Sequence, residues 1–106
     1  MEHGFTKKDW VIFREKIAGW QEAYMDKLNK EYIELLSRDA DPSEKFWELN
    51  KRIRQDRKKT GVQLQMTRSG FIINIVSLIN EGAISFEDLS EFSDELKERV
   101  RRFFER

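Results

Sequence analysis

An apolar stripe runs through the first third of the chain with the spacing of one long helix. Its members recur at intervals of three, four and seven residues: Trp10, Phe13, Ile17, Tyr24, Leu28, Tyr32 and Leu35. Thr6 followed by Asp9 has the pattern of a capping box, and Phe5 can pack on Trp10 across that cap. These signals predict a helix over residues 7–37, which would be roughly 45 Å long. We expect a helix of this length to be the spine against which the other elements pack.

The size and composition of the chain favour one helical domain. The 106 residues are too few for two ordinary domains, but 39% hydrophobic residues, with 8 Phe and 3 Trp, suffice for one core. A single Pro and 5 Gly favour helices over sheets, and the lack of Cys excludes disulfides and thiol chemistry. Residues 1–20 show no signal-peptide pattern, and the longest apolar window is too short for a membrane span. We therefore expect a cytoplasmic protein without membrane partners.

A second helix is predicted over residues 42–60. Asp41 and Pro42 give a strong start signal, because they suit the cap and the first position of a helix. Gly61 is expected to end this helix as a left-handed cap. The predicted apolar seam of the helix consists of three residues at helical spacing: Phe46, Leu49 and Ile53.

The middle of the chain holds a strongly apolar segment preceded by a connector. Residues 70–81 are apolar almost all round, which predicts a helix buried on most sides. Their β-branched side chains would also suit a strand, but Asn80, Glu81 and Gly82 are typical of a helix end, so a helix is favoured. Residues 62–67 alternate apolar and polar and are expected to form an extended connector. A strand paired with another chain is the alternative for that segment.

A fourth helix is predicted over residues 86–105. Ser85 and Asp88 repeat the capping-box pattern of the first helix, and Ser93 leaves open a break followed by a restart. The apolar stripe consists of Phe86, Leu89, Phe92, Leu96, Val100 and Phe103. Residues 1–106 are therefore predicted to form an all-α, single-domain bundle of about four helices with one long N-terminal helix.

Residues that commonly carry catalysis are nearly absent. The only histidine, His3, precedes the first predicted helix, and no serine–histidine pair or glycine-rich phosphate loop can be assembled. The segment that begins at Asp39 lacks the glycine and the bidentate glutamate of a calcium loop. The many carboxylates fit solvated helix faces better than acid–base catalysis. We therefore expect no catalytic residue, no metal site, no cofactor and no enzymatic activity.

Charge is sorted along the chain, although the formal net charge is zero. Residues 45–68 sum to +6 and residues 81–98 sum to −6. On the second predicted helix, an aromatic residue and three cations follow at spacings of four, three and four, and we name them the basic face: Trp47, Lys51, Arg54 and Lys58. This stripe is expected roughly 100° from the apolar seam. A phosphate backbone or an acidic protein groove would select such a surface.

The fourth predicted helix carries the opposite charge at the same spacings. We name these residues the acidic face: Glu87, Glu91, Asp94 and Glu98. Three interpretations stay open: both faces are simply solvated, they meet within the bundle or across a dimer, or at least one binds a foreign macromolecule. Because exposed ion pairs add only about 0–1 kcal/mol each, stability is a poor reason for this sorting. Partner choice is a better reason.

Three stretches carry a resemblance to known small proteins. They are Trp20 to Met25, Asp41 to Trp47 and Leu78 to Leu96. Together they resemble small soluble proteins from mobile elements and phages of Gram-positive bacteria, most of them without an assigned role. Some small proteins from that setting are anti-CRISPR inhibitors, which bind a nuclease effector and block its nucleic-acid channel. The resemblance implies a genomic setting and assigns no binding residue.

Two functions follow as hypotheses. In the first, the chain is a non-enzymatic interaction module for a protein or a protein–nucleic-acid complex, such as an inhibitor that uses the acidic face as a phosphate mimic. In the alternative, the basic face binds the backbone of RNA or DNA. A protein partner is the main expectation, nucleic acid is the second, and a homodimer is left open.

Overall fold

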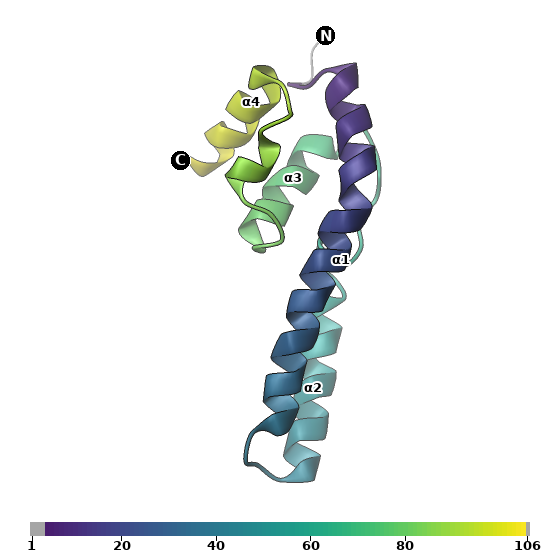
Figure 1. The fold of residues 1–106 in the computed structure, drawn as a ribbon, viewed down its shortest axis with the longest axis vertical. Coiled ribbons are helices and arrows are strands. Elements are labelled where there is room, and N and C mark those ends of the chain that lie inside the picture. The colour runs from purple at the N-terminus through teal and green to yellow at the C-terminus, as the bar shows by residue number, and fades with distance from the viewer. Residues whose placement is uncertain (1–3, 106) are drawn as a thin grey trace.

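A computed structural model describes residues 4–105, and all the regular structure in that range is helical. The elements are α1 (Lys7–Ser37), α2 (Pro42–Asp56), α3 (Phe71–Asn80), the 3₁₀ helix η1 (Phe86–Leu89) and α4 (Asp94–Phe104). α1 spans most of a molecule that measures 56 × 30 × 22 Å. α2 runs back along its C-terminal half to form a hairpin, whereas α3, η1 and α4 form a head beside its N-terminal half (Figure 1). The predicted all-α, single small domain with a long first helix is confirmed.

α1 begins and ends where the sequence predicts, at Lys7 and Ser37. The Asp9 N–H donates to the Thr6 hydroxyl oxygen over 3.0 Å, and the Thr6 N–H donates to Asp9 Oδ2 over 2.9 Å. These reciprocal bonds form the predicted capping box and satisfy amide groups that a helix start otherwise leaves without partners.

The hydrophobic core lies in the head, where α3 is buried. The Phe71 ring meets Phe5 and Trp10 edge to face, at centroid distances of 4.7 and 5.3 Å. Aromatic pairs of this kind add about 0.5–1.5 kcal/mol each beyond the burial of their surface. The buried core consists of Phe13, Phe71, Ile72, Ile75, Val76, Leu78, Ile84, Leu89, Phe92, Leu96 and Val100. The helix predicted over residues 70–81, rather than a strand, is confirmed.

The fourth predicted helix is divided in two. A single helix over residues 86–105 is wrong, because η1 is followed by a turn and α4 begins only at Asp94. Ser93 caps α4 by accepting the Leu96 N–H over 3.1 Å. The Ser93 N–H donates to Asp9 Oδ1 over 2.8 Å, so it is not available to continue a helix from η1. The break that the sequence left open at Ser93 is therefore present.

α2 is shorter than predicted, and Gly61 is not a left-handed cap. The helix ends at Asp56, and the described glycines with positive φ are Gly4 and Gly82. A different constraint acts on Gly61, because a Cβ added there would lie 2.8 Å from Cγ of Tyr24. The chain passes the Tyr24 ring this closely only because it carries no side chain at that position.

The connector between α2 and α3 has no regular secondary structure over residues 63–67. Leu64 packs against the core, whereas Met66 is exposed. An irregular connector therefore joins the hairpin to the head within one chain, and its pairing with another chain stays a hypothesis.

The predicted seam of α2 is largely wrong. It was expected at Phe46, Leu49 and Ile53. In the structure Phe46 is 61% exposed and Ile53 is 40% exposed. The hydrogen bonds between the two helices instead involve Lys45 and Arg52, which donate to α1, and Asp56, which accepts from α1. Because α1 alone covers this part of α2, the covered stripe is narrow and the residues beside it stay in solvent.

Candidate functional site

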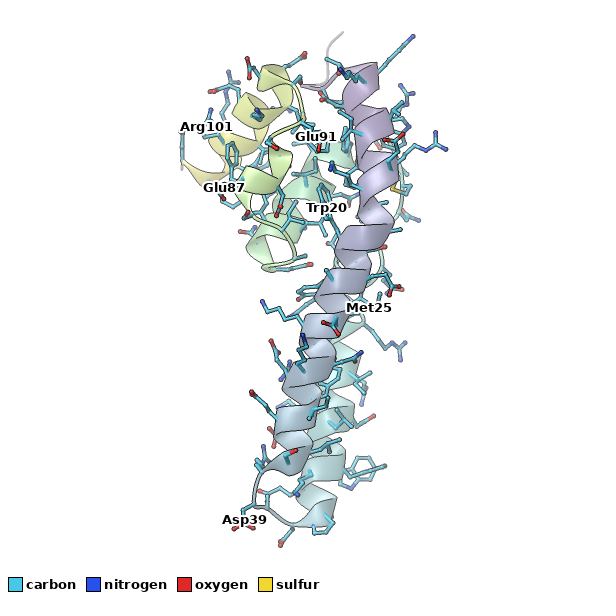
Figure 2. The ribbon with its side chains drawn as sticks, viewed as in Figure 1. Trp20, Met25, Asp39, Glu87, Glu91 and Arg101 are labelled. Carbon is cyan, nitrogen blue, oxygen red and sulfur yellow. The ribbon has the colours of Figure 1, made fainter. Side chains whose placement is uncertain are left out.

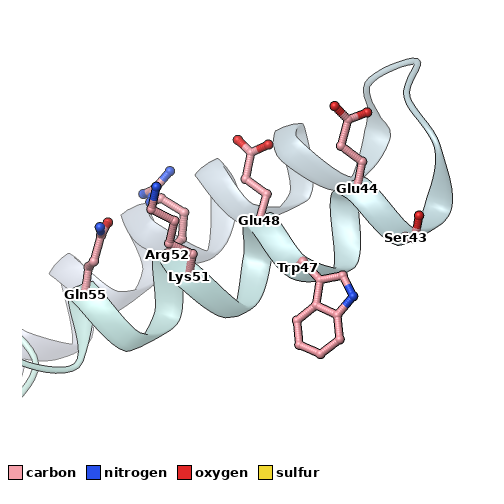
Figure 3. A pocket seen from close by; sticks show the side chains of 7 residues that line it. All are labelled: Ser43, Glu44, Trp47, Glu48, Lys51, Arg52 and Gln55. Atoms are coloured by element: carbon pink, nitrogen blue, oxygen red, sulfur yellow. The ribbon is translucent and has the colours of Figure 1, made fainter.

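The basic face lies on the side of α2 that points away from α1. Trp47 is 64% exposed and projects from the side opposite to Glu44 and Glu48 (Figure 3). Lys51 and Arg54 follow on the same helix, and Lys58 lies in the turn directly after it. All four members are exposed, although Lys58 was predicted on the helix itself. The basic face lies nearly opposite the α1-facing side, farther round the helix than the sequence indicated.

The cations of α2 differ in whether they have an acidic partner. On the side facing α1, an Arg52 nitrogen lies 2.7 Å from a Glu31 carboxylate oxygen. Within residues 4–105, none of the three cations of the basic face forms an ion pair. The charge of Lys51 acts on the carboxylate of Glu48 without forming an ion pair. The three cations therefore produce a positive potential in the solvent outside α2 that Glu48 offsets only in part.

Shallow hollows follow the outer side of α2. The first, of 620 Å³, lies beside Trp47 and Lys51 and is also lined by the carboxylates of Glu44 and Glu48 (Figure 3). A second, of 230 Å³, is bordered by all three cations of the basic face. A third, of 240 Å³, continues to Arg57 and Gln63. No carboxylate lines the second and third hollows, so an extended, negatively charged chain that lies along them would contact each cation in turn.

Beneath the basic face, the buried carboxylate of Asp56 holds α2 on α1. The Tyr32 hydroxyl donates to Asp56 Oδ2 over 2.6 Å, and nitrogens of Lys59 and Arg52 lie 3.3 and 3.5 Å from the carboxylate. Burial acts to raise the pKa of Asp56, but the hydrogen bonds from Tyr32 and Lys59 and the nearby positive charges outweigh it, so the pKa is lowered. Burial, followed by the hydrogen bond to Asp56, raises the pKa of Tyr32 to about 12.

Sequence reasoning missed this polar cluster. A charged residue in a helix is ordinarily assigned to solvent, so Asp56 was not expected at the interface. The available signal was spacing, because the residues nearest α1 recur at intervals of four, three and four: Lys45, Leu49, Arg52 and Asp56. Only one of them is apolar, which hid the pattern.

The Tyr32 hydroxyl predicts how stability depends on alkaline pH. Below pH 10.0, its ordinary pKa, the hydroxyl is protonated in the folded and unfolded chains alike, and its bond to Asp56 contributes fully. As the pH rises towards about 12, the unfolded chain loses this proton before the folded one, so stability falls. Tyr32→Phe is therefore expected to cost about 1–2 kcal/mol at neutral pH and progressively less above pH 10.0. Urea titrations of both proteins across this range measure the difference, and a constant difference would contradict the assignment.

The acidic face is not one surface. Its four residues do not share a helix, because Glu87 belongs to η1, Glu91 to the turn, and Asp94 and Glu98 to α4. Figure 2 shows Glu91 on the side that faces α1, with Glu87 farther from α1. The expected stripe is therefore wrong, because the spacing of four, three and four aligns side chains only along an unbroken helix.

Two carboxylates of the acidic face also have partners within the protein. Glu91 lies 3.0 Å from the Lys16 nitrogen, and Glu98 lies 2.8 Å from an Arg101 nitrogen. These pairs reduce the negative potential that a basic partner would meet. No ion pair among the described residues joins the acidic face to the basic face, so the two surfaces do not neutralise one another.

The described part of the chain was also searched for metal ligands and membrane-spanning helices. No group of three or more potential ligand side chains in residues 4–105 could hold a metal ion, and no described helix is long and apolar enough to cross a membrane. His3 lies outside the described residues. Comparison with family models, curated proteins and solved structures found no match.

Proposed function

We propose that the protein is a non-enzymatic interaction module that binds the phosphate backbone of a nucleic acid through the basic face of α2. The observation that carries this proposal is a line of three exposed cations without ion pairs among the described residues, next to an exposed tryptophan. The exposed charges of this surface contribute little to the stability of the folded protein. The surface gains binding energy once phosphates displace their counterions.

The dimensions of the basic face suit a nucleic-acid strand. Trp47 and Arg54 are seven residues apart on α2, which corresponds to about 10 Å along its axis. Phosphates of one strand recur about every 3.4 Å along a duplex axis, so the face can contact two or three of them. Trp47, one helical turn before Lys51, can stack on an unpaired base. This arrangement favours a single strand over a duplex.

The acidic-face hypothesis has weaker support, because its carboxylates do not share one surface and two of them are paired. The resemblance to proteins of mobile elements suits a module that acts on a protein–nucleic-acid complex. An anti-CRISPR role stays a prediction, and the basic face would then contact the nucleic acid of the effector complex rather than imitate it.

Charge reversal on α2 tests the proposal. A labelled single-stranded oligonucleotide is expected to bind the wild-type protein with an affinity that falls steeply as salt rises. Lys51→Glu combined with Arg54→Glu should lower the affinity at low salt by at least about tenfold, because two phosphate contacts become repulsive. Fluorescence anisotropy at several salt concentrations measures both effects.

The matched control is Lys7→Glu combined with Lys8→Glu. These exposed residues begin α1 in the head, and their reversal changes the net charge by the same amount. The control variant should keep its affinity within about twofold if local contacts dominate over net charge. Equal losses for both variants, or wild-type binding that is absent or insensitive to salt, would reject the proposal.

A further inference from the structure

The hairpin exposes large apolar side chains that its own fold does not cover. We name three of them, with the exposed fractions 44%, 61% and 40%, the apolar flank: Leu36, Phe46 and Ile53. Exposed apolar residues that occur singly are ordinary on protein surfaces, whereas a group of them marks an interaction site.

The three residues of the apolar flank lie on the same side of the hairpin. Phe46 directly follows Lys45, which donates from its side chain to a carbonyl oxygen of α1, and Ile53 directly follows Arg52, which bonds to Glu31 of α1. Leu36 directly follows the buried Leu35 of α1. Because α1 and α2 are antiparallel, the residue that follows an inward-facing position projects to the same side on both helices.

The hairpin is also a single layer of two helices, and this makes the flank costly to leave in water. Helical domains ordinarily bury their apolar stripes between two layers, as in a four-helix bundle. In the head, α3, η1 and α4 provide such cover for α1, but none of them reaches the outer half of the hairpin (Figure 1). A second hairpin laid across the flank would complete a four-helix bundle.

Two charged residues on the same side indicate what kind of hairpin this is. Glu22 follows Gln21, whose side chain donates to the Thr60 carbonyl oxygen over 3.1 Å, and Arg57 follows the inward-facing Asp56. Glu22 and Arg57 therefore both lie towards the open end of the hairpin, one on each helix. Both are exposed, and neither forms an ion pair among the described residues.

We infer that a second copy of this chain covers the apolar flank. A two-fold axis parallel to the hairpin places each α1 over the α2 of the partner, so that neighbouring helices run antiparallel throughout. The same operation brings Glu22 of each copy towards the oppositely charged side chain on α2 of the other. The opposite two-fold orientation, with α1 over α1, cannot pair these two residues, because each helix then faces its own copy in the partner.

The dimer leaves the basic face free. Helical spacing places Trp47, Lys51 and Arg54 on the outer side of α2, whereas the flank is on a lateral side of the hairpin. The contact covers about 16 residues of α1 and the facing part of α2, or about 1,000 Å² in total over both copies. This area is at the lower end for specific interfaces, so we expect a reversible dimer that forms at micromolar protein concentrations.

Sedimentation velocity over a wide range of protein concentration tests the inference. The wild-type chain should pass from monomer to dimer as the concentration rises. Phe46→Glu should raise the dissociation constant about a hundredfold, because the flank of each copy then buries a charge. Val11→Glu is the matched control, since it alters an exposed apolar residue of α1 beside the head and away from the flank, and it should leave the dimer intact.

Charge exchange identifies the orientation of the dimer. Glu22→Arg alone and Arg57→Glu alone should each weaken association, whereas the two substitutions in one chain should restore it. A wild-type chain that stays monomeric at the highest concentration, or a Phe46→Glu variant that associates as well as Val11→Glu, would overturn the inference. The oligonucleotide assay is independent of this outcome, because Phe46→Glu leaves every cation of the basic face in place.

Discussion

Replacing Asp9 by alanine is expected to lower the free energy of unfolding by about 3 kcal/mol, a large part of the stability of a small domain. The carboxylate is 1% exposed and accepts three hydrogen bonds: from the Thr6 N–H, the Ser93 N–H and the Ser93 hydroxyl. The last of these is 2.6 Å long. Asp9 therefore caps α1 and also holds the start of α4, which is 84 residues away in the sequence. The substitution leaves buried donors without an acceptor, and this mechanism gives the largest losses.

The matched control is Asp88→Ala. Asp88 belongs to the second capping box, accepts the Ser85 N–H over 2.8 Å and is exposed. Its removal should cost about 1 kcal/mol, the ordinary value of a cap. Thermal unfolding should show a loss of about 15 °C for Asp9→Ala and about 5 °C for Asp88→Ala, given the size of the chain. Equal losses would mean that the contact between Asp9 and Ser93 contributes nothing.

This pair shows which part of the fold the sequence could predict. Both capping boxes are local patterns, and both are present as predicted. The long-range hydrogen bonds from Ser93 to Asp9 cannot be predicted from the residues around Asp9. A capping box that is exposed to solvent has the same sequence pattern as this buried one. The bond from the Ser93 N–H favours a new helix start at Ser93. The length of the fourth helix therefore depends on a tertiary contact, which the sequence pattern does not reveal.

The basic face was predictable and the acidic face was not, for the same reason. Helical spacing converts sequence positions into a surface only where the helix is continuous. Trp47, Lys51 and Arg54 lie on the unbroken α2, whereas Glu87 and Glu98 are separated by the turn before α4. The interface of α2 was missed because it is polar, with one leucine among its four inward positions.

The exposed residues of the hairpin follow from the same architecture. An apolar stripe predicts burial on the assumption that another element covers it. α2 has only α1 as a neighbour, and the polar cluster around Asp56 occupies part of that contact. Phe46 and Ile53 therefore have a pattern typical of a core but no element of their own chain to cover them. This mismatch is the observation that a second copy of the chain would resolve.

Gly61→Ala is expected to lower the free energy of unfolding by about 2–3 kcal/mol and to loosen the hairpin from the head. The added Cβ would lie 2.8 Å from both Cγ and Cε2 of Tyr24, whose ring is buried in the contact between the helices. The backbone at Gly61 cannot move away freely, because the N–H groups of Thr60 and Gly61 donate to the carboxylate of Glu81 over 2.9 and 3.0 Å. Relief of the clash therefore weakens the bonds that tie the end of the hairpin to α3.

Gly19→Ala is the matched control for this prediction. A Cβ at Gly19 meets nothing within 4 Å, and the residue lies in the exposed interior of α1. The same chemical change should stabilise the protein there by about 0.5–1 kcal/mol, because alanine loses less conformational freedom in a helix than glycine. Amide hydrogen exchange should show faster exchange at Thr60 and Gly61 positions in the first variant only. The two substitutions differ only in what surrounds the new methyl group. If Gly61→Ala lowers the free energy of unfolding and Gly19→Ala raises it, the chain passes close to the Tyr24 ring at Gly61. If both substitutions change it in the same direction, this close passage is excluded.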